Sequence, residues 1–191
     1  MALSPESRQP RIPSLAGLPF HSMYKHGFVR VAVATPAVEV ASPAVNVAEI
    51  VKIGREAGYN SAVLTVFPEL GISAYSNEDL FQQDALLAAS VDALGQLLEA
   101  SRDLGMTFAV GLPLRVDDRL FNCAVLLRRG RLLGVVPKTY LPNYREFYEK
   151  RQFAPASQAL STSIRLLGQT VPFGTRLLFE ATNVPGFVLA L

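Results

Sequence analysis

The sequence predicts an α/β domain built around a mixed sheet, and two observations support this. Apolar runs rich in valine, alanine and leucine, at residues 28–34, 62–67 and 106–112, alternate with segments of helical periodicity, a pattern typical of buried parallel strands. Two later apolar runs, 120–127 and 132–136, flank a polar turn with a glycine, which predicts an antiparallel hairpin. Parallel strands beside a hairpin form a mixed sheet in a layered α/β domain.

The first predicted helix follows the strand at 28–34. Ser42-Pro43 supplies a cap and a first-turn proline, and Gly58 ends the helical spacing of apolar residues. The strand at 62–67 comes next, so the order is strand, helix, strand. This order predicts a crossover that places the two strands side by side and parallel.

A loop at residues 71–81 separates the second strand from a second helix. That helix begins near Asp84, carries a leucine stripe that we interpret as core packing, and ends by Gly105. The third strand follows at 106–112, and the hairpin comes after it. Residues 164–178 and 186–191 supply the last predicted strands.

Composition limits the function classes. With 191 residues, half of them apolar, the chain is long enough for one domain with a substantial core. A net charge of +2 from 18 basic and 16 acidic residues, scattered along the chain, predicts no nucleic-acid partner. A single cysteine fits a reducing compartment, and no apolar run approaches the length of a membrane span, so we expect a cytoplasmic protein without a membrane partner.

Residues 1–19 contain several prolines, serines and arginines without a hydrophobic period, which predicts a flexible N-terminal tail before a domain at 20–191. His21 and His26 flank the entry to the first strand. Neither has a cysteine, aspartate or second histidine at ligand spacing, so we assign them no role and predict no metal site.

Two ionisable residues stand at comparable points of the predicted sheet. Glu69 follows an apolar strand and Pro68, and Lys138 follows an apolar strand and Pro137. Proline lacks the N–H that continues a sheet ladder, so each residue is expected just beyond the end of its strand. Ligands bind at that edge of open α/β sheets. Taken alone, either residue is more often a solvated charge, but buried together each would offset the desolvation of the other.

The surrounding motifs resemble a known family. Phe67-Pro68-Glu69-Leu70 and the run PKTYLPNYREFYEKR at residues 137–151 resemble the nitrilase, or carbon–nitrogen hydrolase, superfamily, and more narrowly the glutaminase domain of glutamine-dependent NAD+ synthetases. The similarity extends from about residue 20 to residue 191. It implies an α-β-β-α sandwich with mixed sheets, C-terminally incomplete in this chain, and association into a homo-oligomer.

The resemblance also implies roles for individual residues. Glu69 is expected as the general base, Lys138 as the cation that stabilises the oxyanion, and Glu146 as a glutamate that orients the lysine and substrate. Tyr144 is expected to line the glutamine pocket. For Tyr144 and Glu146 the alternative is a helix start with solvated polar side chains.

The nucleophile is the residue that the sequence lacks. The family uses a cysteine that follows the strand beginning here at Gly186, and the chain ends at Leu191 just before that position. Cys123 lies in an apolar strand, where a thiol is buried and unreactive, so it is not a substitute. The chain is therefore expected to bind glutamine weakly and to turn it over negligibly by itself.

The resemblance implies a downstream synthetase domain that uses ATP and magnesium, whereas this domain is expected to need no cofactor. The chain itself contains no glycine-rich phosphate loop. Two alternatives remain open from sequence: a freestanding amidase or nitrilase with another substrate, and a catalytically inactive relative that acts as an oligomerisation module.

Overall fold

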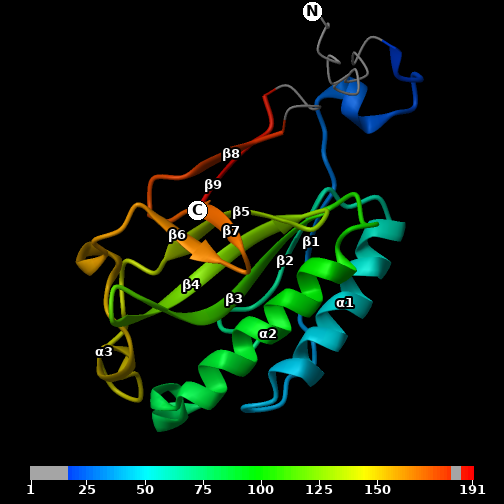
Figure 1. Ribbon diagram of the computed structural model, residues 1–191. Coiled ribbons are helices and arrows are strands. Elements are labelled where there is room, and N and C mark those ends of the chain that lie inside the picture. The colour runs from blue at the N-terminus through cyan, green and yellow to red at the C-terminus, as the bar shows by residue number, and fades with distance from the viewer. Residues whose placement is uncertain (1–16, 182–185) are drawn as a thin grey trace, which may run out of the picture.

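A computed structural model describes residues 17–181 and 186–191, so most of the predicted tail at 1–19 lies outside the described residues. Its centre is a five-stranded sheet in the order β1-β2-β3-β4-β5 (Figure 1). The strands are β1 (Val31–Val33), β2 (Leu64–Val66), β3 (Thr107–Val116), β4 (Arg119–Arg128) and β5 (Arg131–Pro137). β1 pairs with β2 and β2 with β3 in parallel, whereas β4 pairs antiparallel with both β3 and β5, so β5 runs in the same direction as β1 to β3; this confirms the prediction of a mixed sheet.

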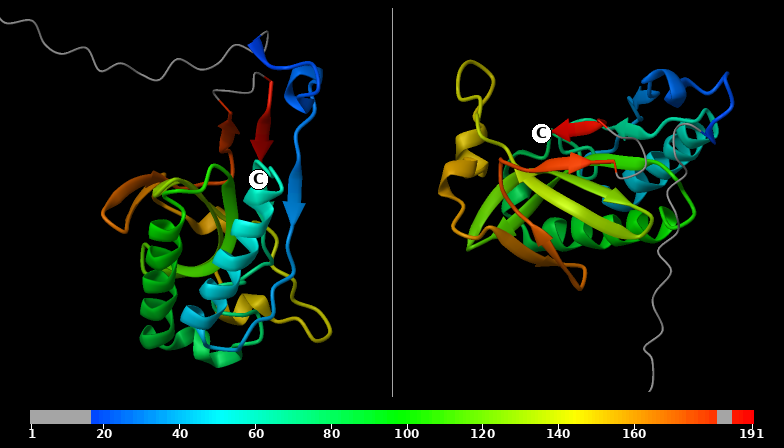
Figure 2. Two further views of the ribbon diagram at one scale, coloured as in Figure 1. Left: turned by 90° about the vertical axis from the view of Figure 1, so that its right-hand side faces the viewer. Right: turned by 90° about the horizontal axis from the view of Figure 1, so that it is seen from above.

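Two long helices cover one face of this sheet. Helix α1 (Pro43–Tyr59) connects β1 to β2, and helix α2 (Asp84–Ala100) connects β2 to β3. Figures 1 and 2 show them side by side on the same face, as two successive crossovers of one hand require. The largest core cluster lies between helices and sheet, and Ile50, Leu94 and Phe108 are among its fully buried members.

The opposite face of the sheet is partly covered by a hairpin of β8 (Leu178–Glu180) and β9 (Val188–Ala190) (Figure 2). Phe179 and Leu189 of this hairpin pack on Leu64, Ala109 and Leu126 of the sheet. The hairpin of β8 and β9 therefore lies on the face of the sheet opposite the two long helices.

A second hairpin of β6 (Ser163–Leu166) and β7 (Gln169–Pro172) stands beside β5. Short helical turns complete the chain: η2 (Met23–His26), η3 (Glu78–Gln82), α3 (Glu149–Gln152) and η4 (Ala156–Gln158). Among the described residues, no helix has the length and hydropathy needed to cross a bilayer.

The third strand is longer than the sequence predicts. The third strand was expected to end at Leu112, but β3 continues through Pro113 and forms its own hairpin with β4. Asp117 and Asp118 make the two-residue turn, with φ angles of 50° and 58°. Aspartate tolerates this left-handed conformation better than most residues, and such turns fit the twist of hairpin strands.

Candidate active site

Glu69 is held by a tight turn at the end of β2. The amide of Gly71 donates to the carbonyl of Pro68 at 3.0 Å, and the amide of Ile72 donates to the carbonyl of Gly111 at 3.1 Å. Leu70 has a φ angle of 52°, a conformation that non-glycine residues seldom adopt, while its side chain is fully buried. Strain of this kind persists only where the surrounding structure fixes it, so the backbone at Glu69 is firmly positioned.

Gly111 on the neighbouring strand lets this turn approach the sheet. A Cβ atom at residue 111 would meet the backbone nitrogen of Leu70 at 2.3 Å and the carbonyl carbon of Glu69 at 3.0 Å. Glycine inside a strand commonly marks such a close approach of another backbone segment. The absence of a side chain at this position therefore helps to place Glu69 against the sheet.

Lys138 lies at the end of β5, where its backbone amide still donates to the carbonyl of Asn122 on β4 at 2.8 Å. Its Nζ donates to Oε1 of Glu69 at 2.6 Å, and to Oε1 and Oε2 of Glu149 at 2.9 Å each. The structure thus brings together two residues that are 69 positions apart in the sequence, as predicted for the shared sheet edge. The Lys138 and Glu149 side chains are 26% and 5% exposed.

The carboxylate that accompanies Glu69 is Glu149, which corrects the expectation for Glu146. Glu146 is exposed, and no described residue forms a hydrogen bond with its side chain, although it lines a cavity of about 200 Å³ that Glu149 also lines. The two glutamates are three residues apart in an irregular segment that ends in the short helix α3. Because such a segment has no regular period, the sequence could not show which of its carboxylates turns inward.

Electrostatics favour a charged lysine in this arrangement. Burial alone would lower the pKa of Lys138, but hydrogen bonds to Glu69 and Glu149 and the charges of both carboxylates outweigh that effect and raise it. Lys138 therefore stays cationic at neutral pH, and its three N–H donors all point at carboxylate oxygens.

Two neighbouring polar side chains complete the group. Tyr75 donates its hydroxyl to Oε1 of Glu149 at 2.7 Å, and its pKa is raised by burial and by this hydrogen bond. Asn122, 3% exposed on β4, donates its side-chain amide to Oε1 of Glu69. No described residue donates to Oε2 of Glu69, so that oxygen is available for a proton from a reacting group.

Sequence reasoning assigned no role to Asn122, although a polar residue inside an otherwise apolar strand was a usable signal. Tyr75 belongs to the segment 74–80, which resembles the family's wall of the glutamine pocket, but no individual role followed for it from the sequence. Tyr144, which was expected to line the substrate pocket, is 64% exposed, and its ring packs near that of Phe147 at a centroid distance of 5.9 Å. The tyrosine hydroxyl that reaches the charged group is that of Tyr75.

Cys123, the only cysteine of the chain, points away from this group. It follows Asn122 on β4, and successive side chains of a strand face opposite sides. Its thiol is 1% exposed in the core cluster beneath the helices, and burial raises its pKa. A thiol in this state is a poor nucleophile, in agreement with the expectation from sequence.

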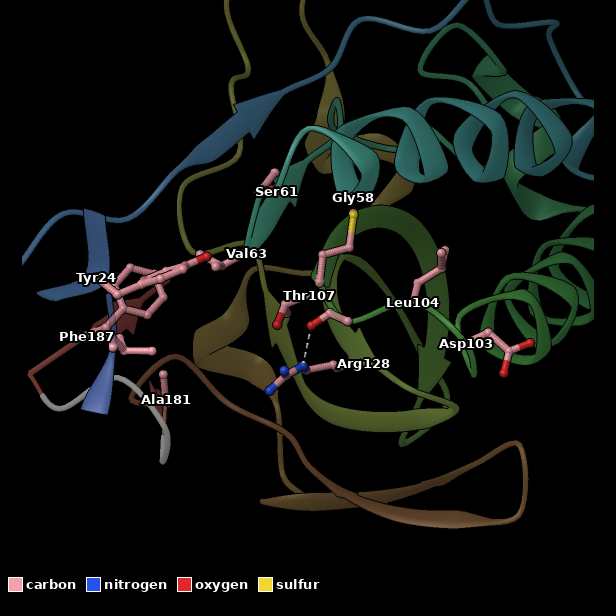
Figure 3. A pocket seen from close by; sticks show the side chains of 14 residues that line it. Tyr24, Gly58, Ser61, Val63, Asp103, Leu104, Thr107, Arg128, Ala181 and Phe187 are labelled. Carbon is pink, nitrogen blue, oxygen red and sulfur yellow. Dashed lines mark hydrogen bonds between the residues drawn. The ribbon is translucent and has the colours of Figure 1, made fainter. Parts of the chain in front are cut away.

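Glu69 and Lys138 line a cavity of about 420 Å³, together with Asn122, Leu191 and other residues. A third cavity, of about 530 Å³, lies at the other end of the strands (Figure 3). There Arg128 is engaged with the carbonyl of Gly105 at 2.9 Å, and Asp103 points elsewhere. Because its charged side chains do not converge, the group around Lys138 is the better candidate for an active site.

Metal ligands do not gather in the described part of the chain. Residues 17–181 and 186–191 contain no group of three or more histidine, cysteine, aspartate or glutamate side chains that could hold a metal ion. The arrangement at Lys138 is instead one of a proton acceptor, a cation and a second carboxylate. It suits acyl transfer, in which a base removes a proton and positive charge stabilises an oxyanion.

Comparison with known proteins shows which family the chain resembles. The carbon-nitrogen hydrolase family matches residues 30–178. The glutamine-dependent NAD(+) synthetase of Mycobacterium bovis is 51% identical over 170 residues, which are 89% of this chain and 25% of that protein. The chain thus spans about a quarter of the length of such relatives.

Solved structures share the fold. A glutamine-dependent NAD(+) synthetase from Cytophaga hutchinsonii superimposes with a TM-score of 0.74 at 25% identity, covering 81% of this chain and 26% of that one. An amidase from Nesterenkonia sp. superimposes with a TM-score of 0.59 at 24% identity, covering 74% of this chain and 53% of that one. The nitrilase-like fold is therefore confirmed, and the chain belongs to the carbon–nitrogen hydrolase family.

Proposed function

We propose that this chain forms the glutaminase part of a glutamine-dependent NAD+ synthetase, which releases ammonia from glutamine for the amidation of nicotinic acid adenine dinucleotide. The observation that carries the proposal is the contact of Lys138 Nζ with both Glu69 and Glu149. Similarity over 89% of the chain to a protein named for that reaction supports the choice of substrate.

Each residue has a separate role in the proposed reaction. Glu69 accepts the proton of a thiol nucleophile through Oε2, and the resulting thiolate attacks the carboxamide carbon of glutamine. Lys138 stabilises the negative charge that develops on the carbonyl oxygen. Glu69 then returns the proton to the leaving ammonia as the C–N bond breaks, and it activates water to hydrolyse the thioester to glutamate.

The thiol itself is proposed to come from the chain beyond residue 191. Leu191 follows β9 and lines the same cavity as Glu69 and Lys138. A residue that continues from Leu191 would therefore start from the wall of this cavity. In this proposal ATP and magnesium act in a separate synthetase part, the glutaminase part needs no cofactor, and the full-length protein is a cytoplasmic homo-oligomer.

Labelled glutamine provides the test. The full-length protein that includes these 191 residues is supplied with glutamine carrying ¹⁵N in its side-chain amide, nicotinic acid adenine dinucleotide, ATP and magnesium. The proposal predicts NAD+ that is one mass unit heavier. Replacement of Lys138 with methionine should abolish this product while leaving NAD+ formation from ammonium intact, because only the glutaminase step is lost.

Two other results would redirect the assignment. Hydrolysis of simple amides or nitriles without any NAD+ formation would identify a freestanding amidase or nitrilase, a function that the amidase-like fold also permits. Absence of amide hydrolysis in a folded, oligomeric full-length protein would identify an inactive relative.

A further inference from the structure

Two short helical turns meet beside the active site through a cluster of polar contacts. Asp79 of η3 accepts hydrogen bonds from both Nε and Nη2 of Arg151, at 3.0 and 2.9 Å, in a two-pronged ion pair. It also accepts from the side-chain amide of Gln152 at 3.0 Å. Arg151 and Gln152 are the last two residues of α3, so one carboxylate holds both.

Buried contacts lie beneath this ion pair. Gln82 donates to the side-chain carbonyl of Gln152 at 2.9 Å, and Gln152 is only 8% exposed. The rings of Phe81 and Phe153 meet edge to face, with centroids 4.9 Å apart. The junction of η3 and α3 therefore has an apolar interior, a partly buried amide pair and a charged rim.

The junction of η3 and α3 connects to both partners of the hydrogen bond between Tyr75 and Glu149. Helix α3 has four residues, too few to be stable without tertiary contacts, and it begins with Glu149. Gln152 is three residues after Glu149, one turn along the same face. Tyr75, whose hydroxyl also bonds to Glu149, immediately precedes the segment that leads into η3. Contacts between η3 and α3 therefore fix both partners of the Tyr75–Glu149 hydrogen bond.

We infer that Asp79 is a positioning residue: by holding Arg151 and Gln152 it fixes α3, and thereby the carboxylate of Glu149 against Lys138 and Tyr75. This inference rests on the proposed function for its effect on glutamine hydrolysis. Its rival is an ordinary surface ion pair, since the Asp79 and Arg151 side chains are 68% and 65% exposed, and such pairs commonly contribute little.

The ionisation state of Asp79 agrees with this role. Hydrogen bonds from Arg151, and then from Gln152, hold the pKa of Asp79 below its usual range. The residue is thus a carboxylate at neutral pH and can accept from all three donors at once. An asparagine at the same position would keep the shape but lose the charge and one acceptor oxygen.

The test compares Asp79→Asn with Asp84→Asn in the full-length protein. Asp84 is a matched control because it also pairs with an arginine, Arg115, at 3.0 Å on the surface, but it joins α2 to β3 instead of reaching α3. Asp79→Asn is expected to lower kcat/KM for glutamine on the order of 10-fold, because small misplacements of catalytic groups have large effects. Asp84→Asn should leave it unchanged.

Two further readouts separate positioning from general stability. The melting temperatures of the two variants should agree within about 2 °C. NAD+ formation from ammonium should be unaffected by either variant. Asp79→Asn combined with Arg151→Gln should be no slower than the slower of the two single variants, because both changes break the same contact.

A substrate-independent readout separates failure of this inference from failure of the proposed function. The ζ-carbon resonance of Tyr75, assigned by its loss in Tyr75→Phe, reports the hydrogen bond to Glu149. It should shift in Asp79→Asn and stay in place in Asp84→Asn. An unchanged resonance, or kcat/KM for glutamine equal in the two variants, would overturn the positioning role. A wild-type protein that never hydrolyses glutamine would instead refute the proposed function, and the resonance would still decide this inference.

Discussion

Replacement of Glu149 with glutamine tests which carboxylate supports Lys138. Glu149 is 5% exposed and accepts two hydrogen bonds from Lys138 and one from Tyr75. Glutamine keeps the shape but removes the charge. A hydrogen bond to a charged group contributes about 1 kcal/mol more than a neutral one. Lys138 retains Glu69 at 2.6 Å as a second partner, which limits the loss.

These contacts predict a loss in the free energy of unfolding of about 1–2 kcal/mol for Glu149→Gln. For a domain of this size the melting temperature should fall by about 5 °C. The value of kcat/KM for glutamine should fall at least about 10-fold, because Lys138 would lose one of the two carboxylates that orient it. Thermal unfolding and glutamate release, both measured in the full-length protein, check these numbers.

Glu146→Gln is the matched control, with the same chemical change three residues away. Because Glu146 is exposed, Glu146→Gln should change the free energy of unfolding of the protein by less than about 0.5 kcal/mol. Equal destabilisation by the two variants, or a larger loss for Glu146→Gln, would refute the reasoning, because the buried and exposed glutamates would then be indistinguishable.

Three other variants test separate parts of the structure. Because the pKa of Lys138 is raised above its ordinary value of 10.5, its contribution to stability is complete below that pH and is lost as the pH rises through the raised pKa. The difference in denaturation midpoint between wild type and Lys138→Met should therefore be constant from about pH 7 to 10 and should disappear at higher pH. A difference that disappears below neutral pH would contradict this. Cys123→Ala should leave glutamine hydrolysis within about 2-fold of wild type, as a steady-state assay would show, since the thiol is buried in the core. Gly111→Ala should reduce hydrolysis on the order of 100-fold by displacing Glu69, and a fully active, folded variant would show that the turn can move without effect.

The sequence was sufficient to predict the parallel strands, both long helices and the hairpin of β4 and β5. The reason is that their hydrophobic periods and their Ser-Pro and glycine boundaries act locally. The predicted third strand ended at Leu112, one residue before Pro113, and proline is uncommon inside a strand. Here the strand accommodates it and continues to the Asp117–Asp118 turn.

Only part of the site could be predicted from the sequence. Glu69 and Lys138 could be paired because proline ends the strand before each, and β2 and β5 run in the same direction within one sheet, so both end at the same edge. Glu149, Tyr75 and the Asp79 contacts depend on how irregular segments fold back on one another. Such tertiary contacts leave no periodic pattern in the sequence. The prediction therefore chose Glu146, whereas the glutamate that contacts Lys138 is Glu149, three residues later.

The central claim is that Glu69 and Lys138 act together on the amide of glutamine, and Glu69→Gln tests it most directly. Steady-state glutamate release by the full-length protein should fall by about 10²–10⁴-fold, the usual contribution of a general base, while NAD+ formation from ammonium is retained. Glu49→Gln changes a partly exposed glutamate on α1 that is paired with Lys52, and it should leave both rates unchanged. Glutamate release by Glu69→Gln at the wild-type rate would contradict the account.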